Sequence, residues 1–321
     1  MNEKSFDIKD ICGNSVVTVP DESEINEGAP RPVKRIAAIH DLSCFGRCAL
    51  TVVIPTLSAM GYQVVPVPTA LLSTHTGGFS GMHFLDTTDS ISQISEHFTR
   101  LGLTFDAIYT GFLGSEAQIS LVEAFIKQFG KDGCYVAVDP VMGDDGMLYA
   151  TYSERLARGM SQLCAHADLI TPNLTEAAFI TGKEYKNTSV MTSEERNAYL
   201  GDICEALEAF GKKRIVITGI HDGDDRLLTY GIDPDSGSFC HSVKRVPKNY
   251  PGTGDLFASV LIGDLLRTDS LSDSARFASE FTSRVMLYTS RFDTPARDGV
   301  ALEAFICELA EHAIPHIPNI I

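Results

Sequence analysis

The chain has 321 residues, of which 44% are hydrophobic, and this is enough to bury a large core. Its formal net charge of −16 argues against nucleic acid and anionic membrane surfaces as partners, because both attract basic patches. The eight cysteines include one close pair, Cys44 and Cys48, without a second pair at zinc spacing, so we expect reduced thiols. With no signal-peptide pattern near the N-terminus and no run of about 20 apolar residues, the sequence predicts a cytoplasmic protein.

In chain order, residues 1–32 are expected to form a loosely ordered N-terminal extension, and residues 33–321 a single domain. From Lys34 onward, short apolar runs of strand length alternate with longer amphipathic stretches. The expected strands are 35–40, 62–68, 106–110, 134–139, 167–171 and 214–218. The expected helices are 47–60, 153–166, 193–210, 254–267 and 272–289, with another after a capping box at 115–118.

The expected strands are apolar on both faces, which is typical of parallel strands covered by helices on each side. The repeated alternation of strands and helices indicates βαβ units. The sequence therefore predicts an α/β fold with a central, mostly parallel sheet and helices on both faces. In such sheets ligands bind at the carboxyl ends of the strands, so the residues that follow each strand are the candidates for a site.

Two strand ends carry polar residues suited to this role. Asp139 follows the strand 134–139, where a carboxylate can reach a metal ion or its water, or can simply accept backbone N–H bonds in a turn. The strand 167–171 runs into Thr171-Pro-Asn-Leu-Thr-Glu176. Asn173 and Glu176, three residues apart at the start of a helix, suit a hydrated Mg²⁺, although a helix cap is the simpler interpretation.

The run Gly252-Thr253-Gly254-Asp255 precedes an apolar helical segment. Two glycines at a helix N-terminus let backbone N–H groups approach a phosphoryl group, and the helix dipole favours its negative charge. Asp255 is then either a helix-stabilising acid or a base that faces an alcohol at this anion site. The sequence contains no Walker A, no G-x-G-x-x-G after a first strand and no G-x-S-x-G. These absences disfavour P-loop NTPases, dinucleotide-dependent oxidoreductases and α/β-hydrolases.

Together, the segments that begin at Asp139, Thr171 and Gly252, in this order, resemble the ribokinase superfamily. Within it they are most similar to the pyridoxal/pyridoxamine (vitamin B6) kinases, over residues from about 34 to 303. The segments Ile39–Arg47 and Thr69–Gly78 support this resemblance, because they are similar to the parts that line the B6 site.

The resemblance implies an ATP-dependent kinase that uses Mg²⁺, acts on a small-molecule substrate and forms a homodimer, with the need for a monovalent cation such as K⁺ left open. Asp255 would deprotonate the 5′-hydroxymethyl group of a B6 vitamer in the salvage of pyridoxal phosphate. Gly252, Thr253 and Gly254 would bind the transferring phosphoryl group, and Asp139 and Glu176 would organise Mg²⁺.

The implied ATP-binding residues are Asp144, Tyr149, Thr171, Asn173 and Thr218, of which the first two belong to a loop, 143–152, that folds over the nucleotide.

The implied substrate contacts are Asp41, Thr69, His75 and Phe112, with a structural role as the alternative for His75. Two departures from the B6 kinases leave the preferred vitamer open. Asp41-Leu42 stands where those kinases carry Ser-His, and Phe112 stands where they often carry Tyr.

Three alternatives remain. Hydroxymethylpyrimidine (phosphate) kinases of thiamin synthesis share the fold, but they often carry Cys where this chain has Asp255. A non-catalytic B6-binding protein would be expected to have lost some of the catalytic set. An NAD-dependent oxidoreductase would need the glycine fingerprint that is absent here.

Overall fold

The computed structural model describes residues 31–149, 152–211 and 213–313. Nine strands form its main sheet. In sheet order they are β11 (Gly237–Lys244), β10 (Arg226–Asp233), β9 (Arg214–Asp222), β8 (Leu169–Ile170), β5 (Tyr135–Val138), β4 (Ala107–Thr110), β1 (Arg35–Phe45), β2 (Gln63–Thr74) and β3 (Phe84–Asp86). The strands from β9 to β2 are parallel, whereas β3, β10 and β11 pair antiparallel at the two edges. The predicted mostly parallel sheet is confirmed.

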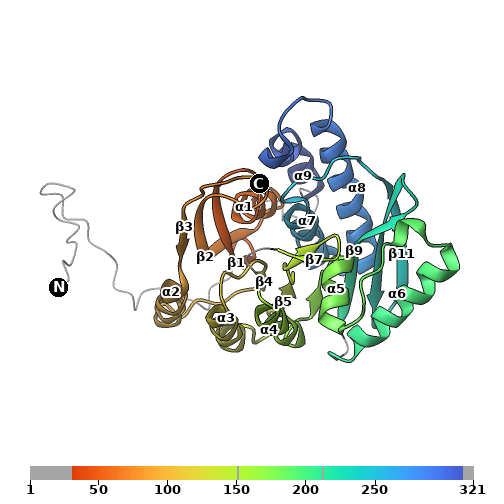
Figure 1. Ribbon diagram of the computed structural model, residues 1–321. Helices are drawn as coiled ribbons and strands as arrows, with labels where there is room; N and C mark the ends of the chain where they lie inside the picture. The colour runs from red at the N-terminus through yellow and green to blue at the C-terminus, as the bar shows by residue number, and fades with distance from the viewer. Residues whose placement is uncertain (1–30, 150–151, 212, 314–321) are drawn as a thin grey trace, which may run out of the picture.

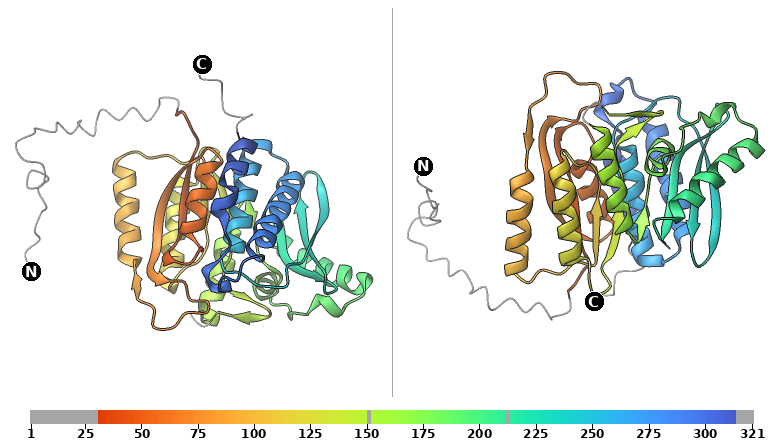
Figure 2. Two further views of the ribbon diagram at one scale, coloured as in Figure 1. Left: turned by 90° about the horizontal axis from the view of Figure 1, so that it is seen from above. Right: turned by 60° about the horizontal axis from the view of Figure 1, so that its bottom comes forward.

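Helices cover both faces of this sheet (Figure 1). One layer contains α2 (Thr88–Arg100), α3 (Glu116–Phe129), α4 (Glu154–Ala165), α5 (Leu174–Thr181) and α6 (Ser193–Glu208). The other contains α1 (Leu50–Ala59), α7 (Thr253–Thr268), α8 (Leu271–Thr289) and α9 (Ile306–Ala313). Figure 2 shows the second layer from above and the first from below.

The interior strand β1 contributes to the cores on both faces of the sheet through the alternation of its side chains. Ile36 and Ala38 pack into the core beneath α1, α7 and α8, while Ala37 and Ile39 pack into the core on the opposite face. All four are fully buried, and burial of a side chain the size of Ile contributes roughly 1.5–3 kcal/mol. This two-sided burial explains why the parallel strands read as continuous apolar runs.

Several elements differ from the sequence-based expectations. β1 and β2 continue past the predicted ends, to Phe45 and Thr74, after a register shift between His40 and Leu42. β10 and β11 were not predicted, because neither includes a long apolar run and the residues of β11 are all exposed or half-buried. Arg31 lies in the predicted loose extension, yet its guanidinium binds Asp106 at 2.7 Å. The rest of that extension, residues 1–30, lies outside the described part.

The capping box predicted at 115–118 is wrong. Ser115 precedes α3, but its side chain makes no capping hydrogen bond. Gln118 instead accepts a hydrogen bond from Gly114 N at 2.8 Å and donates one to the carbonyl of Thr69 at 2.7 Å. A buried amide can satisfy its donor and its acceptor in this way, and here it fastens the start of α3 to β2.

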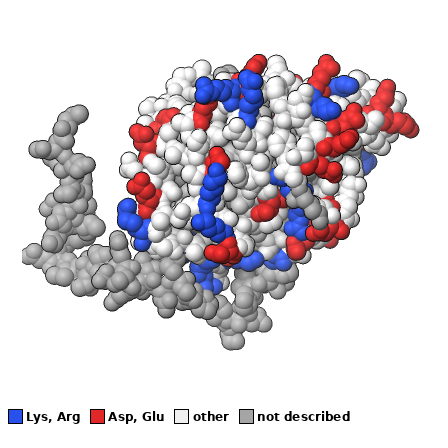
Figure 3. Space-filling model, turned by 90° about the horizontal axis from the view of Figure 1, so that it is seen from below, with Lys and Arg blue, Asp and Glu red and all other residues white. Residues whose placement is uncertain are grey.

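The face formed by the α2–α6 layer carries acidic and basic side chains side by side (Figure 3). Ion pairs on this layer include Lys127 with Glu123 at 2.5 Å and Arg155 with Glu116 at 2.8 Å. Among the helices within the described residues, none combines the length and the apolar character needed to cross a membrane.

Candidate active site

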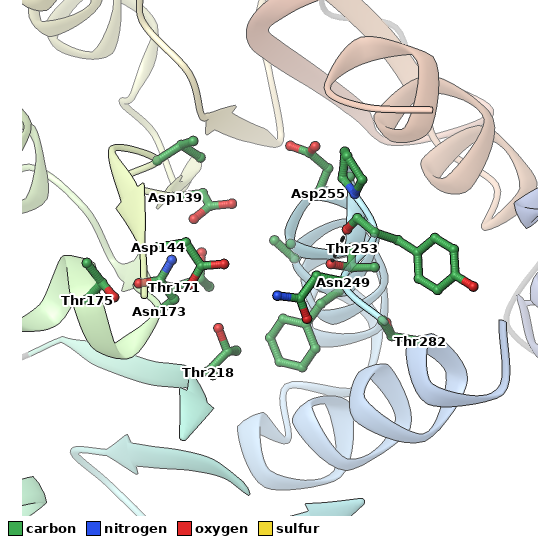
Figure 4. Close-up of a pocket in the computed structure, with 18 of the residues that line it drawn as sticks. Asp139, Asp144, Thr171, Asn173, Thr175, Thr218, Asn249, Thr253, Asp255 and Thr282 are labelled. Atoms are coloured by element: carbon green, nitrogen blue, oxygen red, sulfur yellow. Dashed lines mark hydrogen bonds between the residues drawn. The ribbon is translucent and has the colours of Figure 1, made fainter. Parts of the chain in front are cut away.

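A cavity of about 650 Å³ lies at the carboxyl ends of the parallel strands. Figure 4 shows two walls that face each other across it. Asp139 and Thr171, which follow β5 and β8, and Thr218, which lies within β9, belong to one wall. Asp255 and Thr253, at the start of α7, belong to the other. The sheet topology thus brings three separate sequence motifs to a single cavity.

The α7 wall begins at Gly252, which caps the helix with a φ of +77°. A Cβ at this position would lie 2.1 Å from the carbonyl oxygen of Arg47, so both its conformation and its space require glycine. Thr253 donates its hydroxyl to the carbonyl of Tyr250 at 3.0 Å, which fixes the preceding turn. A Cβ on Gly254 would meet no atom within 4 Å. The first N–H groups of α7 thus form an open site for an anion.

Asp255 lies in the first turn of α7 and lines the cavity. Its Oδ2 accepts hydrogen bonds from Ala49 N at 2.8 Å and from Cys48 Sγ at 3.6 Å. Ala49 has the unusual φ of +49° just before α1, which directs its N–H to this carboxylate. Burial raises the pKa of Asp255, and the Ala49 and Cys48 bonds oppose that rise. These contacts use Oδ2, and no hydrogen bond to Oδ1 is found among the described residues.

Asp139 stands on the opposite wall and is 5% exposed. Burial raises the pKa of its carboxyl well above the usual range, and the charge of Asp255 raises it further, while the hydroxyl of Thr171 opposes the shift. A bound cation would stabilise the charged form of this carboxyl against both burial and the charge of Asp255.

Asn173 and Glu176 form a capping box at the start of α5. Asn173 Oδ1 accepts from Glu176 N at 2.9 Å, and Glu176 Oε2 accepts from Asn173 N at 2.8 Å. Glu176 Oε1 accepts a third bond from Met142 N at 3.0 Å. The capping interpretation of this motif is therefore the one found. Each carboxylate oxygen still has a lone pair for another partner, and burial, followed by the charge of Asp139, raises the pKa of Glu176 well above its usual range.

The carboxylates of this wall fit a hydrated divalent cation better than a closed metal cage. In the described part of the chain, no three His, Cys, Asp or Glu side chains form a group that could hold a metal. However, Asp139, Asp144 and Glu176 all line the cavity, and burial is the main cause that raises each pKa. Mg²⁺ keeps several of its waters and needs only one or two carboxylates, so this donor set suits it.

A small hairpin covers this end of the cavity. It consists of β6 (Gly143–Asp144) and β7 (Met147–Leu148), which pair antiparallel. Asp145 and Gly146 join them with φ values of 48° and 77°, as a type I′ turn requires. Asn173 donates its Nδ2 to the Gly143 carbonyl at 2.8 Å, so the helix cap also holds the hairpin.

The predicted nucleotide loop, 143–152, includes this hairpin, and residues 150 and 151 lie outside the described part. Asp144 and Tyr149 from this segment line the cavity.

The four predicted substrate residues behave differently. Asp41 and Phe112 line the cavity, and burial raises the pKa of Asp41 to about 6 despite a hydrogen bond from Ser43. Thr69 differs from the expected substrate contact, because it is fully buried and lies outside the cavity lining. It donates its hydroxyl to the carbonyl of Phe112 at 2.9 Å. Thr69 therefore supports a lining residue from behind.

His75 lines the cavity, but the protein backbone already uses both of its ring nitrogens. Nε2 lies 2.6 Å from the carbonyl of Arg297, and Nδ1 accepts from Gly77 N at 3.1 Å. This is the arrangement of a structural histidine, which leaves the ring itself to contact a ligand.

All the predicted site residues except Thr69 line this one cavity: Asp41, His75, Phe112, Asp139, Asp144, Tyr149, Thr171, Asn173, Glu176, Thr218, Gly252, Thr253, Gly254 and Asp255. The sequence analysis missed a section of the wall made by β10, β11, α7 and α8. Leu227, Val243, Phe257, Thr282 and Met286 belong to it. Thr282 and Met286 lie four residues apart on α8, so they share one helix face. That spacing could have indicated a cavity-lining helix face, but the same spacing is found on helix faces that pack into an ordinary core.

The comparisons with known proteins agree with this geometry. A family model described as phosphomethylpyrimidine kinase matches residues 37–296. A Bacteroides thetaiotaomicron protein, described as a phosphomethylpyrimidine kinase and crystallised with pyridoxal, is 40% identical. That structure has a TM-score of 0.80 and the match covers 86% of this chain and 96% of that one.

Two pyridoxal kinases are also similar. The pyridoxal kinase of Lactobacillus plantarum is 32% identical in sequence, and its crystal structure matches with a TM-score of 0.79. The match covers 88% of this chain and 99% of that one. The pyridoxal kinase of Arabidopsis thaliana is 27% identical over 245 residues, which are 73% of this chain and 75% of that protein.

Proposed function

This chain belongs to the phosphomethylpyrimidine kinase family, and we propose that it transfers the γ-phosphoryl group of ATP to the 5′-hydroxymethyl group of a vitamin B6 vitamer. It is a kinase with a ribokinase-like fold. The observation that carries the proposal is Asp255, a buried carboxylate at the anion-binding start of α7. Its Oδ2 is held by Ala49 and Cys48. The pyridoxal in the 40% identical relative supports the choice of acceptor.

In the proposed reaction Asp255 orients the substrate hydroxyl and takes its proton. The hydroxyl oxygen forms a bond to the γ-phosphorus as the bond between this phosphorus and its bridging oxygen breaks, and ADP leaves. Backbone N–H groups from Gly252 to Gly254 bind the transferring group, whose charge the α7 dipole favours. Phosphoryl transfer has a loose transition state, so the placement of these groups counts more than the basicity of Asp255.

Asp139 and Glu176 are the residues that would hold Mg²⁺ through its waters, and the ion would supply charge neutralisation for the phosphates. Thr171 and Asn173 would lie beside the phosphates, next to this pair of carboxylates. The remaining nucleotide contacts proposed are Asp144, Tyr149 and Thr218. The position of all these residues on a single wall supports the assignment.

Asp41, His75 and Phe112 are proposed to contact the pyridine ring. Phe112 offers an aromatic face to such a ring, and Asp41 offers a carboxyl that is half protonated near pH 6. Dimerisation, a monovalent cation and a cytoplasmic location belong to the same proposal and rest on the resemblance to B6 kinases.

Phosphorylation of hydroxymethylpyrimidine is the second candidate, because the family takes its description from that activity. The presence of Asp255, where such kinases often carry Cys, favours the B6 vitamer.

A direct test measures ADP release with pyridoxal, pyridoxamine, pyridoxine and hydroxymethylpyrimidine under identical conditions, with Asp255→Asn as the blank. At least one B6 vitamer should give the highest kcat/KM. Faster turnover of the pyrimidine would overturn the substrate assignment. Turnover no higher than the blank for every alcohol would mean a non-catalytic binding protein.

A further inference from the structure

His40 lies on the interior strand β1, next to Asp41, and is not one of the residues that line the cavity. It is fully buried in β1, and neither of its ring nitrogens has a hydrogen-bond partner among the described residues. A buried polar group without a partner is destabilising, so an imidazole in this position requires an explanation. Its Nδ1 lies 4.0 Å from Asp255 Oδ1.

The orientation of this ring is fixed from two sides. Tyr109 packs edge-on against it, with the ring centroids 4.3 Å apart. A Cβ on Gly111 would lie 2.4 Å from both Cε1 and Nδ1 of His40. The backbone of Gly111 has no positive φ, so glycine is needed here for the space that the His40 ring occupies and not for the backbone conformation. The space left by Gly111 is therefore occupied by the edge of the imidazole that carries Nδ1.

The two oxygens of Asp255 have separate surroundings. Oδ2 is occupied by Ala49 N and Cys48 Sγ, at 2.8 and 3.6 Å. His40 faces Oδ1, the oxygen that remains for the substrate hydroxyl. Hydrogen bonds of catalytic groups are often long without substrate and tighten when it binds. A closing movement of the carboxylate toward β1 would complete a charge-assisted bond with Nδ1–H.

We propose that His40 is a positioning residue for Asp255, whose Nδ1–H is directed at Oδ1 and holds this carboxylate in the orientation that receives the hydroxyl proton. The inference rests on the proposed role of Asp255 as the base and adds a residue to it.

Burial lowers the pKa of His40 to about 3, so the ring is neutral at physiological pH and carries one N–H. The other groups that act on Asp255 are Cys48 and Ala49, from the turn before α1, through their hydrogen bonds to Oδ2, and His75, from the segment after β2. Besides burial, the charge of Asp255 raises the pKa of Asp41, which follows His40 on β1, and of Asp139, which lies on the opposite wall of the cavity. A neutral N–H donor at position 40 would thus stabilise the Asp255 carboxylate, in a site that contains several acids, without adding a charge of its own.

The test compares His40→Asn with His40→Gln. The amide of Asn occupies the place of Nδ1, whereas that of Gln occupies the place of Nε2. We expect His40→Asn to keep kcat within about threefold, and His40→Gln to lower kcat roughly 10- to 100-fold, as for the loss of a hydrogen bond to a charged group. The KM for ATP should stay unchanged in both. Tyr109→Phe, which keeps the ring against His40, is the matched control and should retain activity.

Equal losses in the two variants, or no loss in either, would contradict the positioning role. If His40→Gln does not fold, ¹⁵N spectra of the histidines in the wild-type protein still test whether Nδ1 of His40 carries the proton. They should show His40 with its proton on Nδ1, and a changed Nδ1–H signal in Asp255→Asn. A proton on Nε2, or an unchanged spectrum, would exclude the proposal. Activity that survives Asp255→Asn would instead refute the base itself.

Discussion

Gly252 packs so closely against the backbone of Arg47 that a Cβ on Gly252 would lie 2.1 Å from the Arg47 carbonyl oxygen. Gly299 approaches the same oxygen from another side, where a Cβ would lie 2.7 Å away. The turn before α1 is therefore clamped between two late segments of the chain. Since Ala49 follows this turn and holds Asp255, the anion-binding end of α7 and its base are set by one local packing arrangement.

Gly252→Ala should reduce both stability and activity, because the variant needs a strained φ and displaces Arg47. We expect a loss of about 1–3 kcal/mol in the free energy of unfolding and a kcat lowered at least tenfold. Gly254→Ala is the comparison, since its Cβ meets no atom within 4 Å. It should unfold like the wild type yet lose turnover, because a methyl group then enters the anion site. Chemical denaturation and ADP release measure the two effects, and a Gly252→Ala protein of wild-type stability would disprove the packing argument.

Asp255→Ala and Asp255→Asn should lower kcat by roughly 100-fold or more, as expected when a positioned acid–base group is lost. Binding of ATP, measured by calorimetry, should change little because the N–H groups of α7 remain. Asp264 is a suitable contrast for substitution to Asn, because it lies on the same helix and bonds His312 and Ser274 away from the cavity. Its loss should affect stability and spare kcat. Near wild-type turnover in Asp255→Asn would remove the base assignment.

Asp139→Asn and Glu176→Gln should separate metal binding from helix capping. Asp139 carries a charge that burial disfavours, so Asp139→Asn should keep or raise stability while the Mg²⁺ concentration needed for half-maximal rate increases at least tenfold. Glu176 accepts from Asn173 N and Met142 N, and an amide can replace only one of its two acceptor oxygens. Glu176→Gln should therefore lose about 1–3 kcal/mol of stability. A Mg²⁺ titration for Asp139→Asn that matches the wild type would argue against the metal role.

Asp41 should make the protein less stable as the pH rises from about 4 to about 6. In the unfolded chain its carboxyl ionises near pH 4, whereas in the folded protein burial keeps the proton until about pH 6. Between these values the folded state binds more protons, so stability falls by up to about 3 kcal/mol. Asp41→Asn removes this penalty and keeps an acceptor for the Ser43 hydroxyl.

The stability gained by Asp41→Asn should accordingly be small at pH 4 and large at pH 7, measured by urea unfolding at each pH. Asp202→Asn, at an exposed position of α6, should show no such trend. A gain that is constant with pH would indicate that Asp41 is not buried as a protonated carboxyl.

The fold was predictable because parallel strands are buried on both faces, and continuous apolar runs such as Ile36–Ile39 report this directly. The site was predictable for a related reason: residues that follow parallel strands must meet at one edge, whatever their separation in sequence. Asp139 and Thr171 were found in this way.

Other features depend on three-dimensional contacts that no local pattern encodes. The hairpin of β10 and β11 forms part of the cavity wall, but β11 has only exposed and half-buried positions, as an edge strand does. Thr69 fits a substrate motif, yet its hydroxyl turns to the Phe112 carbonyl. Gln118 fits a capping motif, yet it reaches Thr69 on β2. Each side chain had two local options, and tertiary packing selected between them.

The bond between Asp255 and Ala49 joins residues that are 206 positions apart, and this separation bears on how the enzyme comes into being. During synthesis β1 and the turn that carries Ala49 emerge early, and the base follows only with α7. Contacts between distant segments form late in folding, after a long loop has closed. A nascent or truncated chain thus possesses the acidic strand ends without Asp255, the base that we propose. On that proposal, phosphoryl transfer requires α7 to have packed against the turn that carries Ala49.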